Sequence, residues 1–214
     1  MDYHINEIIK RAQESFATHV ATLHKGDFGI DVLDFRRSDG STVYSMRIIF
    51  DHERAHRVFI AGDLGEAVIY PTCPATLEGM ANCFTWRNDN GEIGLDYGYF
   101  LEKVVVASDR YEWSGERFRE DFDRRVKDDG LILPDDFYDD YIDSWSPGIS
   151  IDSRKGVTAS ERVKEALSEI DCDYWEWLYD CGKRISPRVI LWLVALRLAW
   201  EKVEKNESEA KELP

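Results

Sequence analysis

The chain has 214 residues, and its 42 acidic residues against 27 basic residues give a formal net charge of −15 at pH 7. Hydrophobic residues make up 43% of the sequence, which is too much for a disordered acidic chain, so we expect a folded core. The negative balance argues against binding to the phosphate backbone of nucleic acids, which needs clustered Lys and Arg, and against docking on an anionic membrane.

The sequence favours the reducing cytoplasm of a cell. The N-terminus has no basic segment followed by an apolar run, which a signal peptide would need. The longest apolar stretch, residues 189–196, is about half as long as a bilayer requires. No C-x-x-C spacing occurs, so we interpret the four cysteines as free buried thiols, with disulfides as the alternative. They are Cys73, Cys83, Cys172 and Cys181.

The N-terminal half changes from a helical to a strand-like pattern. Apolar residues at helical spacing predict a helix over residues 4–18. Alternation then predicts four strands joined by short turns, which favours an antiparallel meander over a parallel sheet. These strands are expected at residues 30–35, 43–50, 57–61 and 67–70.

The pattern after residue 75 is mainly helical. Helices are predicted at residues 76–84, 97–106, 114–127, 134–143, 160–170 and 187–205. Ser114 is a suitable N-cap, and Pro187 suits the first position of the final helix. We therefore predict an α+β fold, in which a four-stranded antiparallel meander packs against helices and the C-terminal portion is helical. Residues 1–127 are expected to form the α+β domain, with residues 128–214 as an acidic helical portion packed on it.

The negative charge is concentrated. Residues 128–180 contain 15 acidic and four basic residues, a net charge of −11. Residues 128–143 (DDGLILPDDFYDDYID) have seven Asp and no basic residue. A helix over residues 134–143 would carry a row of carboxylates, and like charges at this spacing destabilise a helix by roughly 0.2–0.5 kcal/mol per pair. The row would consist of Asp135, Asp139 and Asp143, with Asp136 and Asp140 beside them.

Three interpretations of this acidic segment stay open. It is a solvated face that keeps the protein soluble, a surface that matches a basic groove built to hold nucleic acid, or a calcium site. The D-x-[DN]-x-[DN]-G loop of the third interpretation is absent from the sequence. The second interpretation makes the five aspartates partner-binding residues.

A second segment, residues 171–180 (DCDYWEWLYD), alternates large aromatic and acidic residues. These rings either pack in the core against Trp192 and Trp200 of the final helix or anchor an interface, since Trp and Tyr dominate binding hot spots. The second alternative adds four partner-binding residues: Asp173, Trp175, Glu176 and Trp177.

Two motifs suggest catalysis and are not assigned to it. His52 and His56 complete an H-E-x-x-H match, but strand-like runs flank it, so a hairpin turn is expected in place of the helix that zinc binding needs. Gly62–Gly65 (GDLG) is interpreted as a strand-to-strand turn, with an active-site loop as the alternative. We predict no catalytic residue, metal or cofactor.

Three segments carry a pattern that resembles small acidic accessory proteins of bacteriophages and integrative elements. They are residues 44–50 (YSMRIIF), 58–68 (VFIAGDLGEAV) and 98–103 (GYFLEK), within a similar region of roughly residues 40–126. The strand–GDLG–strand piece is the most specific part. The resemblance implies an origin in a mobile element, where acidic proteins often counter host defence as anti-CRISPR proteins or DNA mimics. It carries no catalytic residue over.

These observations lead to one hypothesis and two alternatives. The hypothesis is a non-enzymatic, cytoplasmic inhibitor of anti-CRISPR type, which binds the basic nucleic-acid groove of a bacterial CRISPR–Cas or restriction effector and does not itself bind nucleic acid or membrane. The first alternative is an enzyme acting on a nucleotide or an immune signalling molecule, with the GDLG loop near its site. The second is a structural or regulatory adaptor that forms a homodimer through residues 187–205.

Overall fold

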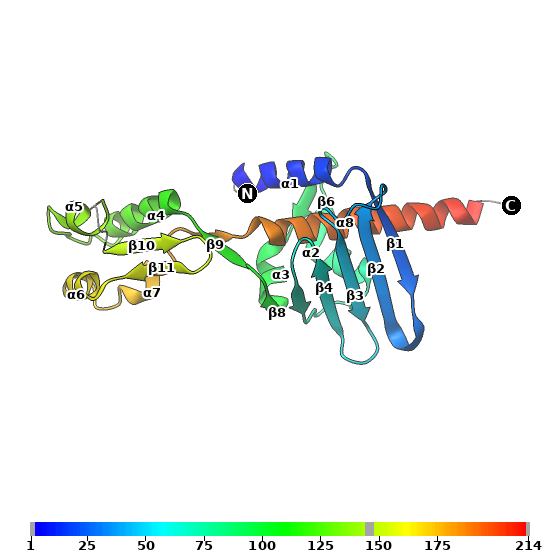
Figure 1. Cartoon of the computed structure of the whole chain (residues 1–214), viewed down its shortest axis with the longest axis horizontal. Coiled ribbons are helices and arrows are strands. Elements are labelled where there is room, and N and C mark those ends of the chain that lie inside the picture. The colour runs from blue at the N-terminus through cyan, green and yellow to red at the C-terminus, as the bar shows by residue number, and fades with distance from the viewer. Residues whose placement is uncertain (1–2, 144–147, 213–214) are drawn as a thin grey trace. The chain divides into compact units, whose positions relative to one another are not determined.

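The computed structural model describes residues 3–143 and 148–212 and confirms an α+β fold (Figure 1). The chain forms two compact units. We call residues 1–110 and 187–214 unit 1, and residues 111–186 unit 2. The sequence placed the boundary at residue 127, whereas the structure returns the final helix to unit 1. The physical reason is that this helix buries its apolar residues in the core of unit 1.

The main sheet of unit 1 has six antiparallel strands in the order β1-β2-β3-β4-β5-β8. The prediction of four strands is therefore too low, because it missed the two edge strands. The strands are β1 (His19–Lys25), β2 (Ile30–Arg37), β3 (Met46–Asp51), β4 (Arg57–Gly62), β5 (Ala67–Ile69) and β8 (Val104–Ala107). Residues 97–106, predicted as one helix, divide into a helix and the β-branched strand β8.

The remaining elements of unit 1 are four helices, a 3-10 turn and a β-hairpin. They are α1 (Tyr3–Ser15), η1 (Asp27–Gly29), α2 (Leu77–Phe84), α3 (Tyr97–Lys103), α8 (Pro187–Glu212) and the hairpin β6 (Thr85–Arg87) with β7 (Ile93–Leu95). Figure 1 shows α8, in orange and red, crossing the direction of the strands.

Helix α8 is the centre of unit 1. It contacts α1, α2, α3, β1 and the β6–β7 hairpin. Its residues 189–196 are buried on nearly every side of the helix, and the indole Nε1 of Trp192 donates a hydrogen bond to Leu64 O at 3.0 Å. The apolar side chains proposed for an adaptor dimer are thus inside unit 1. No helix in the described ranges is long and apolar enough to cross a membrane.

Unit 2 has its own small core. Its elements are β9 (Tyr111–Trp113), α4 (Gly115–Asp128), α5 (Phe137–Tyr141), β10 (Ile149–Asp152), β11 (Gly156–Ala159), α6 (Glu161–Ile170), α7 (Trp175–Leu178) and β12 (Lys183–Ile185). The hydroxyl of Ser114 caps α4, as its sequence position predicted, and the hydroxyl of Ser160 caps α6. Phe118, Phe122, Phe137 and Trp177 gather aromatic rings at the centre of this core.

Candidate functional site

The H-E-x-x-H match lies in the turn between β3 and β4, as predicted. His52 Nε2 lies 3.7 Å from a carboxylate oxygen of Asp31, whereas His56 Nε2 lies 3.0 Å from the carbonyl oxygen of Cys73. A zinc site needs both imidazoles directed at one ion. The separate partners therefore do not fit the metalloprotease arrangement.

The GDLG segment is held as a structural turn. Asp63 Oδ2 accepts a hydrogen bond from Tyr44 N at 2.7 Å, and Leu64 O accepts the one from Trp192 described above. Gly62 and Gly65 adopt φ values of 133° and 94°, which favour glycine. The contacts support the turn interpretation that the sequence favoured.

A groove of about 840 Å³ lies in unit 1 between α1 and the β6–β7 hairpin. Trp86 is 46% exposed in this groove, and its indole rests on Gly94, where an added Cβ would lie 2.2 Å from a ring atom. The size is within the range of ligand pockets. Among the described residues that line it, however, none is a Ser, Thr, Cys or His, so it lacks the nucleophile and imidazole base of common hydrolases.

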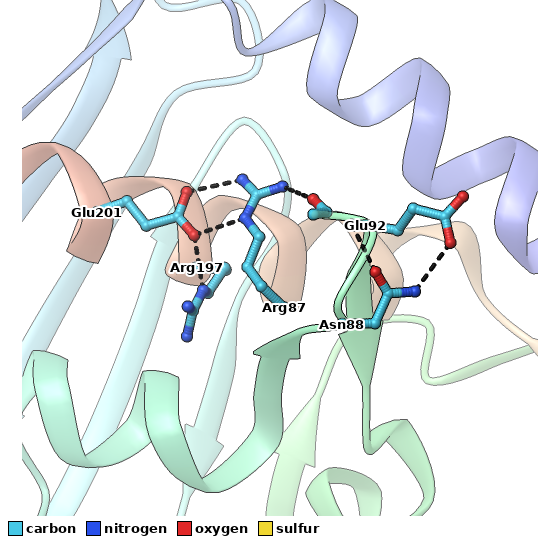
Figure 2. Close-up of polar contacts among 6 residues, drawn as sticks. Arg87, Asn88, Glu92, Arg197 and Glu201 are labelled. Atoms are coloured by element: carbon cyan, nitrogen blue, oxygen red, sulfur yellow. Dashed lines mark hydrogen bonds and ion pairs between the residues drawn. The ribbon is translucent and has the colours of Figure 1, made fainter.

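An ion-pair network fixes this hairpin to α8 (Figure 2). Glu201 accepts hydrogen bonds from Arg87 Nε and Nη2 at 2.8 and 2.7 Å, and from Arg197 Nε at 2.8 Å. Burial acts to raise the pKa of Glu201, but the hydrogen bonds from the two arginines outweigh it and lower that pKa. Asn88 and Glu92 bind each other across the hairpin loop. The network is structural, since every charged group in it has a partner.

The acidic segment 128–143 is mostly not helical. Gly130, with a φ of 64°, follows the end of α4, and α5 covers just five residues. Asp135 and Asp136 precede α5, and Asp143 follows it. The predicted helix over residues 134–143 is therefore wrong at both ends, and the five aspartates do not form one helical row.

Arginines from neighbouring helices neutralise part of this segment. Arg119 Nη1 of α4 binds both carboxylate oxygens of Asp143 at 2.8 and 2.9 Å. Arg162 Nη2 of α6 binds Asp140 at 3.2 Å. Exposed pairs of this kind contribute about 0–1 kcal/mol each to stability, yet they remove charge from the surface. Asp140 and Asp143 are thus not the bare carboxylates that the sequence predicted.

Four other aspartates of the segment are exposed and have no ion-pair partner in the described part of the chain: Asp128, Asp135, Asp136 and Asp139. Ile132 lies among them in sequence and is 87% exposed, while Leu131 and Leu133 pack against the core of unit 2. We call Asp128, Ile132, Asp135, Asp136 and Asp139 the acidic loop surface. Ile132 was missed, although the alternation of inward and outward side chains in an extended chain offered a signal.

Segment 171–180 divides between core and surface. Trp177 is 8% exposed, and its ring is tilted against that of Phe122 with ring centroids 5.6 Å apart. Its Nε1 donates a hydrogen bond to Asp171 Oδ2 at 2.8 Å. The prediction of Trp177 as a surface anchor is therefore wrong, and its packing partner belongs to unit 2 and not to the final helix. Trp175 is 56% exposed, and Asp173 and Glu176 are exposed beside it.

Asp171, Cys172 and Asp173 bring one possible metal-ligand atom each within 4.8 Å of one another. The Trp177 hydrogen bond, followed by that from Asp173 N, lowers the pKa of Asp171. The carboxylate of Asp171 thus already accepts hydrogen bonds that stabilise this turn. An acidic group of this kind is common on protein surfaces, and the contacts assign it to the local fold.

The two acidic segments adjoin at one place. A hollow of about 360 Å³ in unit 2 is lined by Asp128 and Asp129 from the first segment and by Glu176 and Asp180 from the second. Counting Asp121, five carboxylates face two guanidinium groups, those of Arg124 and Arg125. Residues that lie about 50 positions apart in the sequence thus form one negatively charged hollow beside the acidic loop surface.

Comparison with known proteins adds no relative: no family model matches the chain, and neither a curated protein nor a solved structure matches it significantly.

Proposed function

We propose that this protein is a non-catalytic inhibitor that binds the basic nucleic-acid groove of a bacterial defence effector of CRISPR–Cas or restriction type. Unit 2 is the binding part. The acidic loop surface would oppose Lys and Arg side chains of the effector, and the hollow beside it would receive one of these side chains. The site would act in the cytoplasm of the bacterial host. The mobile-element origin rests on the sequence resemblance alone.

The observation that carries this proposal is the hollow where Asp128 and Asp129 meet Glu176 and Asp180, beside four exposed aspartates that have no ion-pair partner among the described residues. Ile132, which is 87% exposed and lies between Asp128 and Asp135 in the sequence, would add an apolar contact to these charges. An apolar anchor surrounded by charge is the usual composition of a binding hot spot with a polar rim. Unit 2 supports it by its charge, with 20 acidic and 11 basic residues, a net of −9 in 76 residues.

The ion pairs within unit 2 change the set of residues that we expect to contact the effector. Asp135, Asp136 and Asp139 remain from the original set, joined by Asp128 and Ile132. Glu176 lines the hollow together with Asp128, and Asp173 and Trp175 are exposed close to Glu176 in the sequence. Asp140 and Asp143 would contribute less, because a partner cation would have to displace Arg162 or Arg119.

The experiment measures displacement of fluorescent duplex DNA from a panel of purified RNA-guided nucleases and restriction endonucleases. The wild-type protein is expected to displace DNA from at least one of them at one-to-one stoichiometry. Displacement should weaken as salt rises, because charges are screened over about 10 Å at 0.1 M salt. Phage plating on bacteria that carry the same defence system gives a second readout, in which the protein restores plaques.

A matched pair of variants tests the surface. Replacing Asp128, Asp135, Asp136 and Asp139 by Asn removes four charges from the acidic loop surface and should weaken displacement at least tenfold. Replacing four exposed carboxylates of unit 1 removes the same charge and should leave displacement unchanged. These are Glu53, Glu78, Asp89 and Glu204. Equal effects of the two variants, or no displacement from any effector, would reject the proposal. Inhibition at trace amounts with a modified product would favour an enzyme.

A further inference from the structure

One face of the six-stranded sheet is not covered by any described element of unit 1. Alternate residues such as Leu33, Ile48 and Ile60 are buried in the core, where α1, α2 and α3 all contact α8. The residues between them point to the opposite face. There Val20, Tyr70 and Val106 are 44%, 38% and 61% exposed.

An apolar row crosses this open face from strand to strand. Val32 of β2 is in register with Ile49 of β3, which is in register with Phe59 of β4. Phe59 is in register with Val68 of β5, and Val68 with Val106 of β8. Five strands thus place an apolar side chain at the same level. Isolated exposed apolar residues are ordinary, but a continuous row marks an interaction surface.

Charged residues flank the row on both sides. On β3 the outward residues are Arg47, Ile49 and Asp51, which read basic, apolar and acidic. Arg47 also binds Asp34 of β2 at 2.7 and 2.9 Å. On β4 the guanidinium of Arg57 lies over the Tyr70 ring, 4.4 Å from its centroid. The row therefore has the polar rim of an interface.

The charge of this face argues for one occupant. The outward side of β2, β3 and β4 carries more basic than acidic residues, namely Arg36, Arg47 and Arg57 against Asp34 and Asp51. The chain as a whole has a net charge of −15. Two copies of such an acidic chain repel each other. They can associate most readily through a surface that is apolar at its centre and close to neutral at its rim.

We propose that the open sheet face binds a second copy of this chain. The two sheets stack face to face about a two-fold axis that runs along the apolar row, so that Ile49 and Phe59 meet the same residues of the partner subunit. The axis places Arg47 opposite Asp51 of the partner subunit, and Asp51 opposite Arg47 of the partner subunit. The basic–apolar–acidic order of β3 is self-complementary in this arrangement.

The first test is the mass of the full chain in solution, measured by light scattering and sedimentation across a hundredfold range of concentration. The wild type is expected to show twice the mass of one chain. Phe59→Asp places two carboxylates against each other at the axis and should yield monomers. Ile132→Asp, the same type of change outside the sheet, should leave the dimer intact. Circular dichroism checks that each variant keeps its secondary structure.

The second test uses cross-linking and adds no charge to the sheet. In a Cys172→Ser background, Ile49→Cys should form a disulfide-linked dimer when a mild oxidant removes the two thiol hydrogens. Ile132→Cys in the same background should cross-link at least tenfold less. A wild type that is monomeric at every concentration, or equal cross-linking of the two variants, would overturn the proposal. The acidic-loop Asn variant should remain dimeric, so this proposal and the proposed function can fail separately.

Discussion

Asp143 and Arg119 bind each other at 2.8 and 2.9 Å across 24 positions of the sequence. The same guanidinium lies 4.5 Å from the centroid of the Tyr138 ring, and Tyr138 donates its hydroxyl hydrogen to Asp123 at 2.7 Å. One arginine of α4 thus joins α5, and Asp143 two residues beyond it, to the rest of unit 2. The densest acidic segment of the sequence is less negative in the folded protein than its composition suggests.

Arg119→Ala should lower the free energy of unfolding of unit 2 by about 1–2 kcal/mol, because it removes the ion pair and the contact with the Tyr138 ring. Arg154→Ala is the control, since Arg154 is exposed and its side chain has no ion-pair partner in the described residues; it should change the value by less than about 0.5 kcal/mol. Urea denaturation measures both. Equal values would show that Arg119 does not stabilise unit 2.

Glu201→Ala should destabilise unit 1 by about 2 kcal/mol, because it leaves Arg87 and Arg197, whose side chains are 31% and 12% exposed, without their carboxylate partner. Glu204→Ala, an exposed change one turn later in α8, should be close to neutral. The pKa of Glu201 is lowered in the folded state, so its contribution is complete above the ordinary value of 4.5. It is lost as the pH falls through the folded pKa. A wild type whose stability is as insensitive to acid as that of Glu201→Ala would contradict this assignment.

His19 predicts a loss of stability in mildly acidic solution. Its side chain is buried between Phe16 and Phe35, and neither ring nitrogen has a hydrogen-bond partner in the described residues. Burial lowers its pKa below 6.5 and outweighs the opposite effect of the nearby Tyr44 backbone. The unfolded chain therefore binds a proton first as the pH falls below 6.5, and the free energy of unfolding decreases.

The stability of His19→Phe should depend less on pH between about pH 5 and pH 7 than that of the wild type. Chemical denaturation at a series of pH values gives the slopes. A His19→Phe protein with the wild-type slope would assign the dependence to other groups.

The cysteines should differ in reactivity. Cys172 is exposed, whereas burial raises the pKa of Cys73 to about 12 and that of Cys181 to about 11. Because the thiolate is the reactive form, an aromatic disulfide reagent at neutral pH should modify Cys172 first. Cys172→Ser should remove this fast phase, and denaturant should expose the others. A fast phase that survives in Cys172→Ser would contradict the assignment of this phase to Cys172.

Two glycines of unit 2 should respond in opposite directions to alanine. Gly182 has a φ of 74°, and an added Cβ would lie 2.6 Å from Ser114 O and 2.8 Å from Phe118 N. Gly182→Ala should therefore cost more than about 2 kcal/mol. Gly115, in the first turn of α4, has open space at its Cβ, so Gly115→Ala should stabilise by about 0.5 kcal/mol. Thermal unfolding of unit 2 compares them, and a neutral Gly182→Ala would contradict the close contact.

Local signals explain the parts of the fold that could be predicted. The Ser114 cap, the turn at His52–His56 and the central strands depend on neighbouring residues, so hydroxyl position, turn residues and alternation were sufficient. The same local signals did not predict the end of α5 or the edge strand β8. The pairing of Val106 with Val68 stabilises a strand that its own short sequence does not distinguish from the end of a helix.

The candidate site depended on the sequence for its charge and on the tertiary structure for its exposure. Composition alone established that residues 128–180 are strongly acidic and carry no recognisable catalytic motif. Only folding brought Arg119 to Asp143, buried Trp177, exposed Ile132 and placed Glu176 at the same hollow as Asp128. The physical reason is that charge belongs to each residue, whereas neutralisation and burial arise from residues that lie far apart in the chain and meet when it folds.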